Sequence, residues 1–227
     1  MTLLDFPGRV ACTVFLGGCN FRCPFCHNSE ILDGREEAVM DDKELLTFLR
    51  KRKGLLDGVC ITGGEPTLKP GLVELLRQIK ALGYPVKLDT NGYRPDMLRK
   101  LAEEGLVDYV AMDIKNGPEQ YAQTVGVSNF DLSRIEESVR FLAQEVVDYE
   151  LRTTVVAQLH SEESVEAMGK WLLETAGKPV KRLFLQSFVD RDTVMFAGLQ
   201  APGEPQMAHY QAILEPFAEI VKIRGTD

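Results

Sequence analysis

Three cysteines lie within eight residues of the chain, with the spacing C-x3-C-x2-C: Cys19, Cys23 and Cys26. Three thiolates can hold a metal centre and leave one coordination position free for a substrate, whereas a structural zinc site is closed by four protein ligands. Thiolates are also the ligands of iron–sulfur clusters, and three of them on a [4Fe–4S] cluster leave the fourth iron free to bind a small molecule. The triplet therefore predicts a metal centre that takes part in chemistry.

Two less reactive interpretations of the triplet stay open. The cysteines could form a zinc site that is closed by His27 or by a distant residue, although the adjacency of Cys26 and His27 makes joint ligation sterically awkward. They could also be buried free thiols. The Gly-Gly pair before Cys19 and the aromatic Phe25 before Cys26 favour a loop wrapped around a cluster. A zinc-binding structural module is the non-enzyme alternative.

Further polar and glycine residues follow, or lie in, the short apolar runs that come after the cysteines: Gly63, Gly64, Glu65, Asp89, Thr90, Asn91, Asp113, Lys115 and Arg152. Glycine lets the backbone approach a ligand closely, and Glu65 offers an acceptor to an ammonium group. Carboxylate and hydroxyl oxygens can bind a hard cation or ribose hydroxyls, and Lys115 offers a positive charge to a carboxylate. The plainer interpretations are turn residues and a surface ion pair.

The elements that must position these residues are short β-branched runs that alternate with amphipathic runs. We expect strands at 10–16, 59–62, 86–88, 109–112, 151–156 and 183–185, and helices at 42–51, 72–82, 96–104, 132–144, 164–175 and 206–221. Strand-then-helix units repeated about six times indicate a parallel sheet covered by helices. Because ligands of such folds bind at the carboxyl ends of the strands, the polar residues should gather at one edge of the sheet.

Composition limits the class of protein. The chain has 227 residues and a formal net charge of -8, so nucleic acid is not an expected partner. The N-terminus does not resemble a signal peptide and no apolar run reaches membrane-spanning length, so we expect a cytoplasmic protein with no membrane partner. Five cysteines in a reducing compartment favour metal binding or catalysis over disulfides.

We expect a single domain over residues 1–227, because the irregular stretch 190–205 is typical of a long loop and not of a domain boundary. Cys12 and Cys60 lie inside apolar strands and are expected to be buried structural residues. Trp171, His160 and His209 are expected to have packing or surface roles.

Taken together, these motifs resemble the radical S-adenosylmethionine superfamily. The cysteine triplet with Phe25 resembles its cluster motif, and Thr-Gly-Gly-Glu-Pro at 62–66 resembles the motif that holds the methionine amino group. The resemblance is strongest to the activating enzymes of glycyl radical enzymes. Counterparts of three blocks occur there in the same order: Phe-Cys-His-Asn at 25–28, Asp-Thr-Asn-Gly at 89–92 and Met-Asp-Ile-Lys at 112–115.

Within that group, the opening Leu-Leu-Asp-Phe-Pro-Gly at 3–8 is most similar to the activating proteins of anaerobic ribonucleoside-triphosphate reductase. The chain is also similar to the pyruvate formate-lyase activators. Two departures stand out. Those activators have a histidine after their last strand, whereas the stretch Leu-Gln-Ser-Phe at 185–188 has none, and no cysteine-rich insertion lies between residues 26 and 60, which favours a single cluster.

The resemblance implies an α/β fold, an incomplete (β/α)6 TIM-like barrel of parallel strands that is open on one side. It implies one [4Fe–4S] cluster on Cys19, Cys23 and Cys26, with S-adenosylmethionine as the second cofactor. The residues it implies for S-adenosylmethionine are Phe25, His27, Gly63, Gly64, Glu65, Asn91, Asp113, Lys115 and Arg152. Among these, Gly63 to Glu65 would hold the amino group, Lys115 and Arg152 the carboxylate, Phe25 and His27 the adenine, and Asn91 the ribose. Asp89, Thr90 and Asp113 resemble a monovalent-cation site.

The implied activity is that of a radical oxidoreductase of anaerobic metabolism. S-adenosylmethionine is cleaved reductively to methionine and a 5′-deoxyadenosyl radical, which abstracts a hydrogen from a glycine of a partner glycyl radical enzyme. A reduced flavodoxin or ferredoxin is the expected electron donor. The expected partner is anaerobic ribonucleoside-triphosphate reductase, and the alternatives are pyruvate formate-lyase, another glycyl radical enzyme or a small-molecule substrate.

Overall fold

The computed structural model describes residues 2–35 and 37–225, and its centre is one sheet of seven parallel strands. The strands pair in chain order, each with the next: Ala11–Leu16 (β1), Gly58–Gly63 (β2), Val86–Thr90 (β3), Tyr109–Asp113 (β4), Asp148–Val155 (β5), Leu183–Ser187 (β6) and Val221–Arg224 (β7). Among the described residues no pairing joins β7 back to β1, so the sheet is open. The incomplete α/β barrel expected from the resemblance is confirmed.

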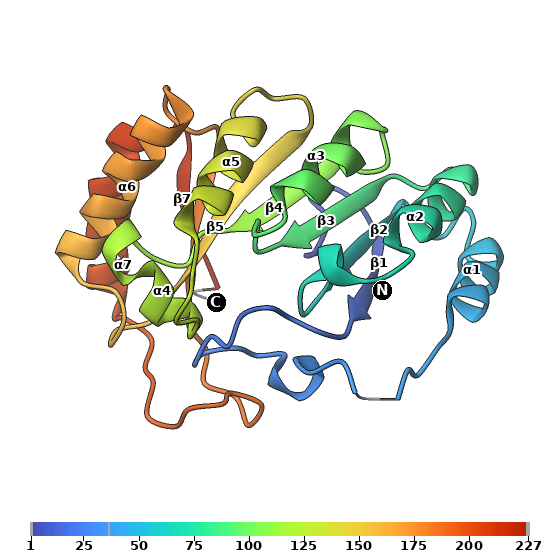
Figure 1. Cartoon of the computed structure of the whole chain (residues 1–227), viewed down its shortest axis with the longest axis horizontal. Coiled ribbons are helices and arrows are strands. Elements are labelled where there is room, and N and C mark those ends of the chain that lie inside the picture. The colour runs from blue at the N-terminus through green and yellow to red at the C-terminus, as the bar shows by residue number, and fades with distance from the viewer. Residues whose placement is uncertain (1, 36, 226–227) are drawn as a thin grey trace.

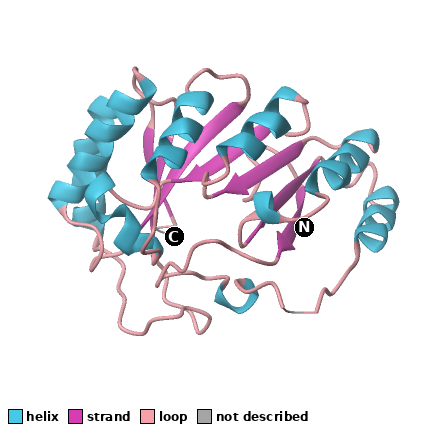
Figure 2. Cartoon of the chain, in the orientation of Figure 1, coloured by secondary structure: helices cyan, strands magenta, loops and turns pink. Residues whose placement is uncertain are grey.

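Helices connect the strands along the outer side of the curved sheet (Figures 1 and 2). They are Asp42–Lys51 (α1), Leu72–Ala81 (α2), Pro95–Glu103 (α3), Pro118–Val125 (α4), Leu132–Leu142 (α5), Glu162–Ala176 (α6) and Glu204–Leu214 (α7), with short 3-10 turns at Ser29–Ile31, Pro66–Leu68 and Glu215–Phe217. The start of α1 shows how local chemistry sets a boundary. Asp41 accepts from the Glu44 backbone N–H while Glu44 accepts from that of Asp41, a reciprocal cap of the first turn.

The C-terminal part differs from the prediction of one helix over 206–221. Helix α7 ends at Leu214, a 3-10 turn containing Pro216 follows, and Val221–Arg224 forms strand β7 beside β6. Proline has no backbone N–H and disfavours a helical residue before it. The free edge of β6 then offers pairing partners that no local pattern records, so the sheet has one strand more than expected. Helix α4 was also not predicted.

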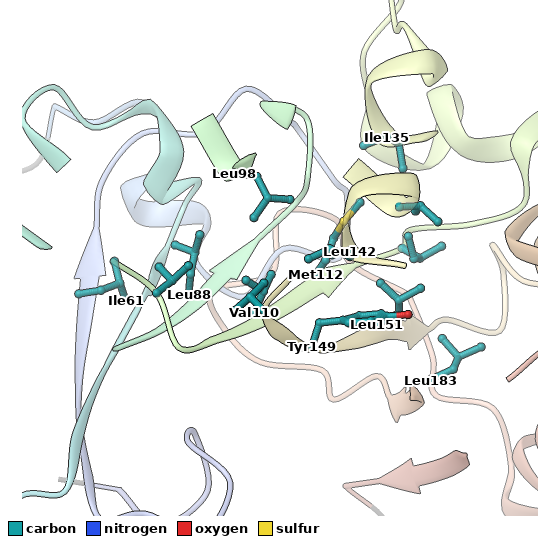
Figure 3. Close-up of a cluster of buried hydrophobic side chains, with 14 of the residues drawn as sticks. Ile61, Leu88, Leu98, Val110, Met112, Ile135, Leu142, Tyr149, Leu151 and Leu183 are labelled. Carbon is teal, nitrogen blue, oxygen red and sulfur yellow. The ribbon is translucent and has the colours of Figure 1, made fainter. Parts of the chain in front are cut away.

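The core lies between the sheet and its helices. Figure 3 shows strand residues such as Ile61, Leu88 and Val110 beside helix residues such as Leu98 and Ile135, all fully buried. Burial of each such side chain contributes about 1.5–3 kcal/mol. Because the strands are parallel and covered in this way, their carboxyl ends are held at a common edge.

The residues expected to be structural are placed largely as predicted. Cys60 is fully buried, whereas Cys12 is half-buried and packs against the core. His160 and Trp171 are buried and His209 is exposed. None of the described helices has the length and apolar character needed to cross a bilayer. That the chain forms a single domain stays a prediction.

Candidate active site

A cavity of about 210 Å³ lies at the carboxyl ends of the strands and collects nearly all the residues that the sequence analysis singled out. It is lined by Cys19, Cys23, Phe25, Cys26, His27, Gly63, Gly64, Asp89, Thr90, Asn91, Asp113, Lys115 and Arg152. Thr62, which opens the predicted glycine motif, also lines it, as do Thr154 and Gln186, which were not predicted. The clustering expected at one edge of a parallel sheet is therefore observed.

The cysteine loop follows β1 and is closed by backbone hydrogen bonds. The N–H groups of Gly18 and Cys19 donate to the carbonyls of Ile31 and Leu32, at 2.7 and 2.9 Å. Gly18 has a φ of +89°, a conformation that favours glycine. Within the loop, Cys26 N–H donates to the Cys23 carbonyl at 3.1 Å, which brings the last two thiols toward the same cavity.

The glycine pair at the end of β2 has a structural reason that the sequence did not reveal. A Cβ on Gly63 would lie 2.3 Å from the carbonyl oxygen of Leu16, and one on Gly64 would lie 2.2 Å from that of Gly18. The N–H groups of Gly64 and Glu65 donate to these same two carbonyls, at 2.9 and 2.8 Å. Both glycines line the cavity. Here the close backbone approach is to the start of the cysteine loop, which it fixes against the end of β2.

The three thiols are electrostatically unusual. Burial raises the pKa of Cys19 to about 11 and that of Cys23 to about 12, and it also raises the pKa of Cys26. The nearby Lys115 ammonium opposes all three shifts. Without a metal the thiols are therefore protonated at neutral pH, and metal binding must release protons.

The donor set, three thiols around one cavity, fits a [4Fe–4S] cluster. Among the described residues no three His, Cys, Asp or Glu side chains are grouped so as to hold one metal ion. The thiolates of a [4Fe–4S] cluster each bind a different iron, so they need to surround a common cavity without meeting at one point. Cys19, Cys23 and Cys26 satisfy that condition.

Glu65 does not line the cavity, although the sequence analysis expected it to hold an ammonium group. It is fully buried, and its carboxylate accepts from the N–H and hydroxyl of Thr67, from the Thr90 hydroxyl at 2.8 Å and from the Asn91 N–H at 2.6 Å. Burial raises its pKa, and these donors oppose the rise. In this arrangement Glu65 joins the segment after β2 to the segment after β3, and its contact with a ligand stays a prediction.

An ionic network, which we call the cavity cluster, includes four residues that line the cavity and one that lies behind them. Asp89, Asp113, Lys115 and Arg152 line it, and Lys87 pairs with Asp89 from outside the lining. Arg152 Nε lies 3.0 Å from Asp113 Oδ1, and Arg152 Nη1 lies 3.3 Å from Asp89 Oδ2. Lys115 Nζ lies 2.9 Å from Asp113 Oδ2, and the Lys87 ammonium pairs with Asp89. Burial alone would raise the pKa of Asp113, but Arg152 and Lys115 hold it at about 2.

The cavity cluster has three cationic side chains and two carboxylates, so it carries one surplus positive charge. A ligand carboxylate could balance that surplus. Lys87 was not predicted to belong to the site, although a lysine between Val86 and Leu88 in an apolar strand was a visible signal. Its side chain is 3% exposed, so it faces the interior.

The same network bears on the predicted monovalent-cation site. Asp89 and Asp113 already pair with lysine and arginine side chains, and the Thr90 hydroxyl donates to Glu65. A metal cation at these oxygens would compete with those partners. That site stays a prediction.

The segment after β6 packs on the cysteine loop, and Figure 1 shows these two segments together at one edge of the molecule. His27 stacks on Phe188, with ring centroids 5.7 Å apart, and His27 Nε2 lies 2.6 Å from the Val189 carbonyl. Phe196 N–H donates to the Pro24 carbonyl at 3.3 Å. Gln186, in the stretch without a histidine, lines the cavity.

Comparison with protein families gives an independent result. The model of the Radical SAM superfamily matches residues 13–172, which include the cysteine loop, the glycine pair and every residue of the cavity cluster. A protein of Methanocaldococcus jannaschii, provisionally named a glycyl-radical enzyme activating enzyme, is 29% identical over 99% of this chain and 92% of its own length. A provisionally named GTP 3′,8-cyclase of Thermococcus kodakarensis is 33% identical over 55% of this chain and 42% of its own length.

Solved structures support the fold. SuiB of Streptococcus suis, determined with bound S-adenosylmethionine, superposes with a TM-score of 0.73 at 15% identity over 97% of this chain. The chain spans about half the length of SuiB, 51%. A domain of the pyruvate-formate lyase-activating enzyme of Bacteroides vulgatus gives a TM-score of 0.59 at 20% identity, over 74% of this chain and 99% of that domain.

Proposed function

The chain belongs to the radical S-adenosylmethionine superfamily, whose cofactors are a [4Fe–4S] cluster and S-adenosylmethionine, and we propose that it activates a glycyl radical enzyme. The observation that carries this proposal is a cavity lined by three thiols and by four residues of the cavity cluster, which with Lys87 carries one surplus positive charge. The near full-length similarity to the Methanocaldococcus protein supports activation over other radical reactions.

In this proposal Cys19, Cys23 and Cys26 each bind one iron and leave the fourth for the ligand. Lys115 and Arg152 attract the methionine carboxylate, because together with Lys87 they carry one positive charge more than Asp89 and Asp113 balance. The backbone at Gly63 and Gly64 receives the amino group.

Two aromatic side chains and one amide complete the ligand site. Phe25 and His27 flank the adenine, and Asn91 lies near the ribose; all three line the cavity. Phe25 is buried and Lys115 Nζ lies 5.9 Å from its ring centroid, so the ammonium and the ring limit each other's movement.

When bound, the two cofactors supply a one-electron cleavage of S-adenosylmethionine to methionine and a 5′-deoxyadenosyl group that takes a hydrogen atom from the partner's glycine. The chain orients the ligand and excludes water. Burial of the thiols and of the ionic wall provides that exclusion, and the packing of the β6 segment on the cysteine loop extends it.

The partner that we propose is anaerobic ribonucleoside-triphosphate reductase, with pyruvate formate-lyase or another glycyl radical enzyme as the alternative. The sheet is unclosed among the described residues, which supports the approach of a protein segment to the cavity. A reduced flavodoxin or ferredoxin supplies the electron, and the reaction belongs to the anaerobic cytoplasm. The acidic net charge of -8 disfavours nucleic acid as a substrate.

A small-molecule radical reaction is the second candidate, because part of the chain is similar to a GTP 3′,8-cyclase. That similarity reaches only 55% of this chain, whereas the similarity to the activating enzyme reaches 99%. Activation of a protein is therefore the better supported function.

The test is anaerobic purification with iron, sulfide and zinc analysis, followed by reduction in the presence of S-adenosylmethionine. About four irons and four sulfides per chain and formation of 5′-deoxyadenosine are expected. A glycyl radical signal by electron paramagnetic resonance in one of several purified partners then identifies the substrate. Zinc without sulfide would favour the structural module, and 5′-deoxyadenosine without a radical in any partner would favour a small-molecule substrate.

A further inference from the structure

His160, which the sequence analysis expected to have a packing or surface role, is buried and bonded at both ring nitrogens. It lies in the segment that leads from β5 to α6 and is 2% exposed. Its Nε2 lies 3.0 Å from the carbonyl oxygen of Lys115, and its Nδ1 lies 3.1 Å from the backbone nitrogen of Val156. The Tyr210 hydroxyl of α7 donates to the His160 carbonyl at 2.8 Å. The imidazole therefore joins the segment after β5 to the segment after β4.

The two partners of the imidazole determine which ring nitrogen carries the hydrogen. A carbonyl oxygen can only accept, so Nε2 must donate to Lys115. Nδ1 is then the acceptor, and the backbone N–H of Val156 donates to it. The Val156 carbonyl, 3.2 Å from Nδ1, already accepts from the N–H groups of Leu159 and His160. Burial lowers the pKa of His160, so the ring is neutral at neutral pH and has this one tautomer.

The residue that accepts the imidazole hydrogen bond is the one whose ammonium lines the cavity. Lys115 Nζ lies 2.9 Å from Asp113 Oδ2 and 5.9 Å from the ring centroid of Phe25, and the lysine side chain is 14% exposed. A mostly buried side chain transmits a shift of its backbone to its far end, because a close-packed interior leaves little space to absorb the shift. The position of the Lys115 carbonyl therefore bears on the position of the charge.

Other hydrogen bonds join the same two segments without involving residue 115. The Ile114 N–H donates to the Arg152 carbonyl at 2.7 Å, and Asn116 Nδ2 donates to the Leu159 carbonyl at 2.8 Å. These two bonds fix the residues on either side, whereas the imidazole fixes residue 115 itself.

We propose that His160 is a positioning residue for the ligand carboxylate: by holding the Lys115 backbone, it sets where the Lys115 ammonium meets that carboxylate. The inference rests on the carboxylate-binding role proposed above for Lys115. It does not depend on which partner is activated. A ligand that has the carboxylate should therefore lose affinity when the imidazole bond is removed, whereas the same ligand without the carboxylate should not.

The experiment compares two ligands, S-adenosylmethionine and its decarboxylated form, on protein reconstituted with its cluster and kept oxidised. The ratio of their equilibrium dissociation constants measures recognition of the carboxylate, and a general loss of stability does not change it. Lys115→Met should lower the preference for S-adenosylmethionine about 100-fold. His160→Met, which cannot donate a hydrogen bond, should lower it about tenfold, a typical coupling for residues in contact.

Further variants separate positioning from packing. His160→Gln places an amide donor near the position of Nε2, so it should retain the wild-type preference even if the protein unfolds more readily. His209→Met, at an exposed position, is the matched control and should also retain it. In protein that already carries Lys115→Met, His160→Met should lower the preference no further, because both residues act through one ammonium.

The outcomes separate this inference from the proposed function. An unchanged preference in His160→Met, beside the loss in Lys115→Met, would overturn the positioning role and leave the carboxylate site intact. A further loss on top of Lys115→Met would also overturn it, because His160 would then act by another route. An unchanged preference in Lys115→Met would overturn the proposed carboxylate site and the inference with it.

Activation of a partner is tested separately, and the absence of a radical in any partner would leave these affinities unaffected. If His160→Met does not assemble a cluster, His160→Asn takes its place, because the shorter amide does not reach the position of Nε2. An unchanged preference in that variant would contradict the inference in the same way.

Discussion

The inner face of the sheet carries two ionic clusters that differ in charge balance. The cavity cluster has three cations for two carboxylates. A second group, which we call the β7 cluster, consists of Tyr109, Glu150 and Arg224. Glu150 accepts from both terminal nitrogens of Arg224, at 2.8 and 2.9 Å, and from the Tyr109 hydroxyl at 2.7 Å.

The two clusters share strand β5. Glu150 and Arg152 are two residues apart, so their side chains lie on the same face of the sheet. Arg152 also lines a second cavity together with Glu150 and Arg224. The β7 cluster pairs one carboxylate with one guanidinium and ties β4, β5 and β7 together. A balanced cluster needs no ligand, whereas the cavity cluster retains a charge that a bound anion can neutralise. Charge balance therefore distinguishes a structural ion pair from a binding wall on one strand.

The largest effect is expected from removing one of the three cysteine ligands of the cluster. Cys23→Ala should abolish cluster assembly and formation of 5′-deoxyadenosine, because one iron loses its only protein ligand. Iron and sulfide analysis after anaerobic reconstitution measures it. Cys12→Ala is the matched control: this half-buried strand cysteine lies outside the cavity and both properties should persist. Full activity of Cys23→Ala would refute the ligand assignment.

The next largest effect is expected from removing the surplus positive charge of the cavity cluster. Lys115→Met leaves two cations for two carboxylates, so the affinity for S-adenosylmethionine should fall about 100-fold, the cost of losing one charged hydrogen bond in a buried site. Equilibrium binding to the reconstituted protein measures it. Glu150 does not line the cavity, so Glu150→Gln should change the affinity far less than Lys115→Met does. Equal losses in the two variants would show that charge balance does not separate the clusters.

A pH effect should follow from the cavity cluster. The pKa of Asp113 is held at about 2 against a usual value of 3.8, so its carboxylate stabilises the fold above about pH 4. This contribution of about 2 kcal/mol is lost as pH falls toward 2. Denaturant unfolding of the cluster-free protein across that range measures it. The difference between wild type and Asp113→Asn should shrink as pH falls, and a constant difference would contradict the assignment.

The smallest effect concerns the β7 cluster alone. Glu150→Gln should lower the free energy of unfolding by about 1 kcal/mol, because the Arg224 side chain is 37% exposed and stays hydrated when its partner is neutralised. Thermal unfolding of the cluster-free protein measures it as a drop of about 2–4 °C in Tm. An unchanged Tm would mean that this pair does not hold β7 to the sheet.

Most of the sheet and part of the site could be predicted from the sequence. Six strands were expected from their apolar runs and are present, since such runs are local signals. Strand β7 was missed because its pairing with β6 is a long-range contact, and 206–221 was read as one helix. Cys19, Cys23 and Cys26 were found from spacing alone, whereas Lys87 was missed because its role depends on Asp89 also pairing with Arg152 of another strand.

The sequence by itself determined the thiol triplet, the glycine pair and the strand ends that carry polar residues, because spacing along a chain is a local property. Only the tertiary structure decided that Glu65 bonds to Thr90 and Asn91, and that Lys87, Asp89 and Arg152 form one charged network. These residues come from different strands, and their hydrogen bonds exist only after the sheet brings the carboxyl ends together. Burial then makes each pairing strong, since charges removed from water must be matched by protein groups or by a ligand.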